Sequence, residues 1–444
     1  MPEVLERVAP NRVVQNTPAE HAPATLPEPK AERHPLGPLK VVHAFWLSGM
    51  SCDGCSISVL GATDPTVESL INGRVAGMPR VDLHHCVLSV DVGEDFIHSY
   101  LLAERGELGA PYVVIYEGSI ADERIAAATG GYFSAMGTEK LGKDENGDEI
   151  NRPIPTAEWL ARLAPGAAAV IAIGTCATWG GIPAAAGNPT GSMSLMDFLG
   201  RDYRSVFGLP IINIPGCSPV GDNFTETVAM VLLFLQGIAP LPEFDDLGRP
   251  AWLFNDTVHQ RCVRAGFYEE GTFAKEYGDK ECLVEIGCWG PVVQCNITSR
   301  GAINHMGGCM NTGGICIGCT MPGFPDTFSP FYKKPPGTIL SSNASRAYGS
   351  VIRRLRRITQ EFGNQEVRWN WKGETPSGWG DHAKPTFLRR GIHYFYEAWQ
   401  QSGSTPPGRK GDDSKFWGAK RPDAAKPVYK GRVTSFRGDE DKNK

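Results

Sequence analysis

Twelve cysteines are the residues of this 444-residue chain whose type and spacing are best suited to chemistry. Cys52 and Cys55 form one C-x-x-C pair, and Cys316 and Cys319 form another. The first residues contain neither a basic stretch followed by an apolar one nor a twin-arginine pair, so we expect a cytoplasmic protein, at most peripheral to a membrane. Because disulfides are rare in the cytoplasm, closely spaced cysteines predict metal ligands.

Four cysteines come directly after apolar segments that are typical of strands, and we call them the strand-end set. They are Cys52, Cys55, Cys176 and Cys217. The carboxyl ends of parallel strands share one edge of a sheet, where ligands bind, so we expect these distant thiols to meet. The glycines beside them allow the backbone to approach and to donate N–H groups to sulfur.

The remaining candidate ligands form two further groups of four. The histidine set consists of His259, Cys262, Cys282 and Cys288, and the loop set consists of Cys295, Cys309, Cys316 and Cys319. Eleven cysteines and one histidine thus give three complete four-ligand sets. Cys86 is left over, and we expect it to be a small buried apolar residue in a strand.

The same ligands are compatible with more than one kind of metal site. Structural zinc also uses four cysteines or three cysteines and a histidine. Zinc ligands usually come from one compact module, whereas the strand-end set extends from Cys52 to Cys217. Three sets in one chain favour an electron relay, because zinc cannot change its oxidation state. A zinc scaffold and an iron–sulfur subunit of another oxidoreductase, such as a quinone- or formate-linked complex, remain alternatives.

The elements that would position these ligands can be read from the apolar pattern. Nearly continuous apolar runs predict strands at residues 39–47, 81–90, 111–116, 167–173 and 209–214. Such runs are typical of parallel strands that are covered on both faces. Segments of helical length lie between most of them, so residues 39–225 are expected to form a doubly wound α/β domain.

The other regions have a different character. Residues 1–38 contain eight prolines and are expected to be an extended arm. Residues 226–335 start with an apolar helix at 228–236 and continue as a largely irregular metal-binding domain. Residues 336–444 form an extension with an amphipathic helix at 344–362 and a basic tail. The net charge of −5 argues against nucleic acid, and the longest apolar run, eight residues, is too short to span a membrane.

Several ordered motifs resemble the small subunit of nickel–iron hydrogenases, over about residues 46–326. They are Cys52-x-x-Cys55-Ser56, Glu-Gly-Ser-Ile at 117–120, Gly-Thr-Cys-Ala-Thr-Trp-Gly-Gly at 174–181, Pro215-Gly216-Cys217, His259-x-x-Cys262-x-Arg264, Gly-Cys-Trp-Gly-Pro at 287–291 and Cys-Ile-Gly-Cys-Thr at 316–320. The resemblance implies a flavodoxin-like domain, with the strand-end set holding a proximal cluster and the histidine set a distal one. It assigns Cys295, Cys316 and Cys319 to a medial cluster and places the catalytic nickel–iron centre in a separate large subunit.

Five positions depart from the family pattern. Cys309 stands where many relatives have Pro and a three-iron medial cluster, so we expect three 4Fe-4S clusters here. Gly54 and Gly181 occupy the places of the two extra cysteines of oxygen-tolerant membrane-bound relatives, which excludes their six-cysteine cluster. Asp53, where Thr is common, is a candidate iron ligand or a loop-capping residue. Ile57 replaces a usual Glu.

The function expected from the resemblance is electron transfer in a nickel–iron uptake hydrogenase. Electrons from hydrogen oxidation would pass from the proximal to the distal cluster and on to a quinone or redox protein. This chain itself would contain no catalytic residue; for Glu117, assistance to proton movement and structural hydrogen bonding are both open. The long C-terminal extension resembles the actinobacterial-type, high-affinity group, and a dimer or higher assembly of heterodimers is expected.

Overall fold

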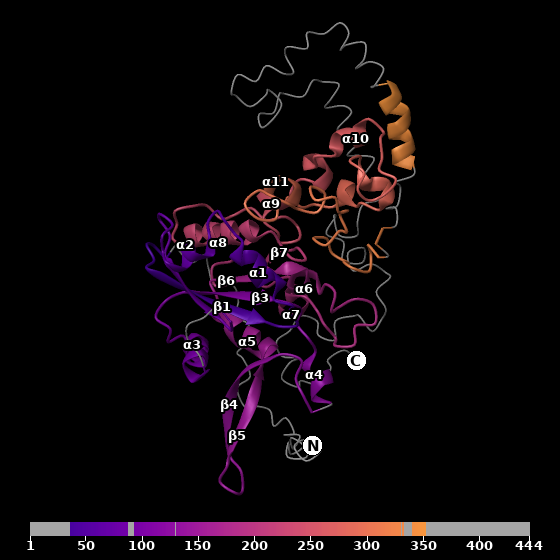
Figure 1. The fold of residues 1–444 in the computed structure, drawn as a ribbon. Coiled ribbons are helices and arrows are strands. Elements are labelled where there is room, and N and C mark those ends of the chain that lie inside the picture. Colours follow the sequence, from indigo (N-terminus) through magenta and orange to yellow (C-terminus); the bar gives the residue numbers. More distant parts are fainter. Residues whose placement is uncertain (1–35, 88–92, 129, 330, 333–339, 352–444) are drawn as a thin grey trace, which may run out of the picture.

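The computed structural model describes residues 36–87, 93–128, 130–329, 331–332 and 340–351, and its first domain is built on a five-stranded parallel sheet (Figure 1). The strands are β1 (Val41–Ser48), β2 (Arg80–His85), β3 (Tyr112–Glu117), β6 (Ala169–Ile173) and β7 (Ile212–Ile214). Their spatial order is β2-β1-β3-β6-β7, which is the flavodoxin-like order 2-1-3-4-5 of the parallel strands. The expected fold class is therefore confirmed.

Helices cover both faces of this sheet. One face carries α1 (Gly54–Leu60), α2 (Val67–Ile71) and α8 (Gly221–Leu235); the other carries α3 (Gly93–Arg105), α5 (Thr156–Leu163) with the 3-10 turn η1 (Ala164–Gly166), and α7 (Leu195–Leu199). Val228 and Leu232 of α8 pack into the core beneath the sheet. The domain boundary expected at residue 225 thus falls inside α8, and we place this helix with the first domain.

The second domain is largely irregular. Its elements are α9 (Ala251–Phe254), η2 (Val258–Arg261), α10 (Ala265–Glu269), η3 (Leu283–Ile286), η4 (Gly290–Val292) and α11 (Ile297–Arg300). Its small core includes Val258, Leu283 and Phe328 together with Cys288 and Cys316. Cysteines are thus part of the packed interior, as expected for a domain that depends on metal.

Some expectations fall wholly or partly outside the described residues. These are most of the N-terminal arm, the second half of the helix expected at 344–362, and the basic tail. Residues 340–351 are helical, which agrees with the start of that helix. Among the described residues, no helix is long and apolar enough to cross a membrane.

The expectation for Cys86 was wrong. Strand β2 ends at His85, so Cys86 lies just beyond the strand and is exposed. Its sulfur is 3.7 Å from the hydroxyl oxygen of Ser48, at the carboxyl end of β1. The apolar run had predicted a strand to residue 90, but the pairing of β2 with β1 ends at His85, opposite Trp46, and residues 88–90 lie outside the described part of the chain.

A hairpin that the sequence did not predict projects from the first domain (Figure 1). It consists of β4 (Ala135–Lys143) and β5 (Glu149–Pro155), which pair only with each other. A lone two-stranded hairpin is marginally stable in water, so its base needs other contacts. The indole N–H of Trp159 on α5 supplies one, because it donates to the carbonyl oxygen of Met136 over 2.8 Å.

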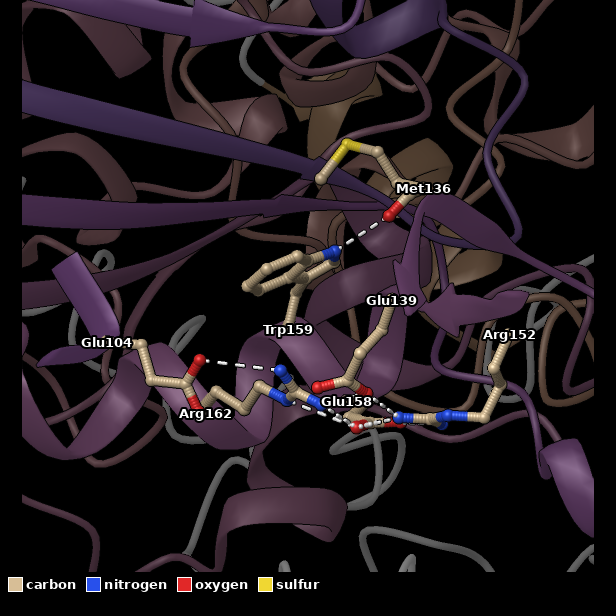
Figure 2. Close-up of polar contacts among 7 residues, drawn as sticks. All are labelled: Glu104, Met136, Glu139, Arg152, Glu158, Trp159 and Arg162. Atoms are coloured by element: carbon tan, nitrogen blue, oxygen red, sulfur yellow. Dashed lines mark hydrogen bonds and ion pairs between the residues drawn. The ribbon is translucent and has the colours of Figure 1, made fainter. Parts of the chain in front are cut away.

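Charged side chains complete this anchor (Figure 2). Arg152 of the hairpin donates to Glu158 of α5 over 2.7 Å and to Glu139 over 2.6 Å. Arg162, also on α5, contacts both carboxylates and stacks over Trp159. Burial raises the pKa of Glu158, but hydrogen bonds and charge from the two arginines outweigh it and leave this pKa lowered. The stabilisation is therefore complete at neutral pH and is lost only as the pH falls below the usual glutamate range.

We expect Glu158→Gln to loosen the hairpin, because two partly buried guanidinium groups then lose one of the two carboxylates that they share. The local opening free energy of β4 and β5, measured by amide hydrogen exchange, should fall by about 2 kcal/mol. Glu149→Gln is the matched control, because Glu149 forms an exposed ion pair with Lys140 and should change stability by less than about 0.5 kcal/mol. Equal effects of the two variants would contradict the anchoring role.

Candidate metal centres

The strand-end set meets at the carboxyl edge of the sheet, as the sequence predicted. Cys52 follows β1, Cys55 lies in the first turn of α1, Cys176 lies in α6 (Gly174–Trp179) after β6, and Cys217 follows β7. Burial raises the pKa of the Cys55 thiol, and Glu117 and the other three thiols raise it further. A metal ion would offset this repulsion and displace the thiol protons, so the donor set fits a metal cluster.

Glycines keep space open around these sulfurs. A β-carbon at Gly174, whose φ is 83°, would overlap the sulfur of Cys55. A β-carbon at Gly181 would lie 2.8 Å from the sulfur of Cys176, and one at Gly54 would lie 3.2 Å from that of Cys52. Any side chain at these positions would therefore enter the space between the ligands.

Glu117, at the end of β3, holds the first C-x-x-C loop through hydrogen bonds to its backbone. This fully buried carboxylate accepts the backbone N–H of Cys55 over 3.0 Å, that of Ser56 over 3.3 Å and the indole N–H of Trp46 over 3.0 Å. The hydroxyl of Ser56 also donates to it and lies 3.0 Å from His85 Nε2. Of the two roles considered for Glu117, the contacts show structural hydrogen bonding. Sequence reasoning missed His85, because no motif marks it.

Asp53 stands at the N-cap position of α1 in a left-handed conformation, with φ 58°. Its side chain makes no cap hydrogen bond, so the loop-capping alternative does not explain it. The residue is exposed beside Cys52, at the same edge as the rest of the strand-end set. A role of its carboxylate as an iron ligand stays a prediction.

The histidine set lines a cavity in the second domain. Its walls are Val258, His259, Cys262, Arg264, Cys282, Leu283, Val284, Cys288, Gly290, Pro291 and Met310. Burial lowers the pKa of His259 to about 4, so the imidazole is neutral at pH 7, which is the form that binds metal. Backbone N–H groups of Gly290 and Cys316 donate to the Cys288 sulfur over 3.4 and 3.3 Å. All four expected ligands thus face one enclosed space.

The loop set also comes together. Burial raises the pKa of the Cys295 thiol to about 12, and the nearby Cys309 thiol acts in the same direction. Cys319 lies close enough to Cys295 and Cys309 for their charges to raise its pKa in addition to burial, and Cys316 responds in the same way to Cys295 and Cys319. Cys309 is the most exposed of the four. The structure therefore places a fourth thiol beside the three that the family resemblance assigned.

The three sets form a row in which neighbours are joined through the backbone. The N–H of Cys217 is directed at the sulfur of Cys319, which connects the strand-end set to the loop set. The hydroxyl of Thr175 donates to the carbonyl oxygen of Cys319 at the same junction. At the other junction, the Cys316 N–H that donates to Cys288 connects the loop set to the histidine set.

Comparisons with known proteins agree with this arrangement. Residues 254–332 match the family of C-terminal regions of NiFe/NiFeSe hydrogenase small subunits, and residues 52–231 match NADH ubiquinone oxidoreductase, 20 Kd subunit. The chain is 32% identical over 295 residues to the periplasmic [NiFeSe] hydrogenase small subunit of Desulfomicrobium baculatum, covering 66% of this chain and 87% of the relative. The chain belongs to the nickel–iron hydrogenase small-subunit family.

Two further relatives refine the comparison. Hydrogenase-2 small chain of Escherichia coli K12 is 33% identical over 290 residues, which is 63% of this chain and 67% of that one. The actinobacterial-type NiFe-hydrogenase from Ralstonia eutropha H16 matches in structure with a TM-score of 0.68 and 48% identity, covering 78% of this chain and 96% of that one. This hydrogenase small subunit is therefore an iron–sulfur electron-transfer subunit, and small subunits of its family pair with a nickel–iron large subunit.

We expect Gly174→Ala to lower the iron bound per chain, because the added methyl group would occupy the place of the Cys55 sulfur. Gly187→Ala is the matched control: its φ of 95° gives similar backbone strain, but a β-carbon there meets nothing within 4 Å. Iron and acid-labile sulfide should fall in the first variant and stay at the wild-type level in the second. Equal iron contents would show that Gly174 does not protect the cluster space.

Proposed function

We propose that this chain carries electrons from hydrogen oxidation through three 4Fe-4S clusters, with the strand-end set proximal, the loop set medial and the histidine set distal. The unbroken row of three four-ligand sets is the observation that carries this proposal. When bound, each cluster supplies reversible one-electron storage. The protein's own part is to hold the ligands, to donate N–H groups to their sulfurs and to keep water away.

The exposed end of the row is where we place the large subunit with its nickel–iron centre. Cys52 and Cys217 are exposed, and the apolar side chains of Ile57, Val87 and Ile182 near them are 67%, 72% and 56% exposed. Apolar surface of this kind is typical of a protein–protein contact. A large subunit on this face would cover the proximal cluster, and the bond chemistry would take place wholly within that partner.

The opposite end of the row, at the histidine set, is where electrons would leave for a quinone or a redox protein. Val263, between Cys262 and Arg264, is 70% exposed and marks the surface there. The 48% identity to an actinobacterial-type NiFe-hydrogenase agrees with the group that the sequence suggested. Uptake of hydrogen and an assembly of several heterodimers are part of this proposal.

The decisive test is metal analysis of anaerobically purified protein with every co-purifying chain retained. Three four-iron clusters predict about twelve iron and twelve sulfide per copy of this chain, with about one nickel in a larger partner. Iron and sulfide without nickel would instead support a subunit of another oxidoreductase. About three zinc per chain, one for each four-ligand set, would show a structural metal protein.

A separate prediction concerns the medial cluster. Cys309→Pro should convert it to a three-iron form, because one of its four thiolates is lost. Electron paramagnetic resonance should then show a new three-iron signal, and the iron content should fall by about one per chain. Cys86→Ala is the control, because it removes a cysteine that belongs to none of the three sets. An unchanged medial signal in Cys309→Pro would refute the ligand assignment.

A further inference from the structure

Each ligand set lies beside a fixed charge, and the charge at the strand-end set is negative. Glu117 accepts hydrogen bonds from Trp46, Cys55 and Ser56, and every one of these partners donates. Its two oxygens therefore act as acceptors toward every one of these neighbours. Glu117 lies directly against the set, because the backbone N–H of Cys55 donates to it over 3.0 Å. In keeping with this position, it raises the pKa of both Cys55 and Cys176 in addition to the effect of burial.

The loop set lies beside a buried cation. Arg249 is 2% exposed and donates through Nη2 to Gln294 Oε1 over 2.6 Å, directly before Cys295 in the chain. Its Nη1 faces the sulfur of Met321, two residues after Cys319. The guanidinium thus lies between the two segments that supply these thiols, and it lowers the pKa of Cys295 against the effect of burial.

Asp245 is the counter-ion of Arg249, with Nε to Oδ2 at 2.7 Å. Asp245 holds only the Nε side of the guanidinium, whereas Nη1 and Nη2 face Met321 and Gln294 of the loop-set segments. The pair therefore presents its positive end to the interior.

The histidine set lies beside a second cation. Arg264 donates through Nη1 to the backbone carbonyl oxygens of Asp279 and Glu281, over 2.5 and 2.9 Å. Its backbone N–H donates to the Cys262 sulfur over 3.4 Å. Its charge acts on Cys262 and Cys282, whose thiol pKa values it lowers against burial.

We propose that these fixed charges grade the reduction potentials along the row, so that electrons run downhill from the strand-end set to the loop and histidine sets. Reduction adds one negative charge to a cluster, which a neighbouring carboxylate opposes and a neighbouring guanidinium favours. One electron moves at each step and no covalent bond changes in this chain. The two protons from each hydrogen molecule would be released from the large subunit and would not pass through this chain. The inference rests on the proposed function and deepens it, because it names the residues of this chain that would favour electron flow in the direction of hydrogen oxidation.

The test is redox potentiometry of the whole hydrogenase, with each cluster followed by electron paramagnetic resonance. Arg249→Gln should shift the reduction equilibrium of the medial cluster at least tenfold toward the oxidised form. For a one-electron couple, a tenfold shift lowers the reduction potential by about 59 mV. Glu117→Gln should shift the proximal equilibrium by a similar factor toward the reduced form. Arg249→Lys keeps the charge, so its medial reduction equilibrium constant should stay within threefold of the wild-type value.

Two controls remove buried charges of the same kind away from the cysteines. Arg162→Gln removes one of the two cations of the hairpin anchor in Figure 2. Glu123→Gln removes a carboxylate on α4 (Glu123–Ala127) that accepts the backbone N–H groups of Phe133 and Ser134. Neither should move any cluster potential. A merely structural role of Arg249 would lower iron content but leave the potential of the clusters that remain unchanged.

The outcomes separate this inference from the proposed function. A wild-type protein without three redox-active clusters would overturn the proposed function. Suppose instead that both Arg249→Gln and Glu117→Gln keep three clusters and that each reduction equilibrium constant stays within threefold of the wild-type value. This result would overturn the graded charges but not the proposed function. If Arg249→Gln does not assemble its medial cluster, the opposite shift expected in Glu117→Gln decides the question.

Discussion

Burial of thiols beside one another is the constraint on which the rest of this structure depends. Burial raises the pKa of Cys55, Cys282 and Cys316, and neighbouring thiols raise each of them further. As thiolates, such groups are stable only when cations lie among them, and the metal supplies that charge. The fold must therefore enclose the ligands closely enough to exclude water while it leaves space for the metal between them.

The two domains meet this constraint in different ways. In the first, β3 and β6 are buried on both faces, and their rigid ends carry Glu117 and Cys176 to one edge. In the second, the elements are short and the packed core includes Cys288 and Cys316 themselves. In the first domain the buried sheet positions the metal ligands, whereas in the second domain the ligands are themselves part of the core.

This difference explains which features the sequence could predict. The strand-end set was predictable because each cysteine adjoins an apolar run, and parallel strands bring their carboxyl ends together whatever their separation in the chain. The hairpin was not, because β4 is mostly exposed and depends on Glu158 and Arg162 of a helix that follows it. The apolar part of α8 was recognised, but its place on the sheet depends on long-range packing that no local pattern contains.

Arg249 is another feature that only the folded chain shows. In the sequence it is one arginine in a Gly-Arg-Pro turn, and nothing local connects it to Cys295. In the structure it bridges Asp245 and Gln294 in a buried position, and its charge acts on a thiol 46 residues further along. The contacts between neighbouring sets are also visible only in the folded chain. The backbone N–H of Cys217 faces the sulfur of Cys319, and the backbone N–H of Cys316 donates to the sulfur of Cys288. The ligands of one set therefore help to fix the electrostatic environment of the next, so the three sets act as one electrostatic unit.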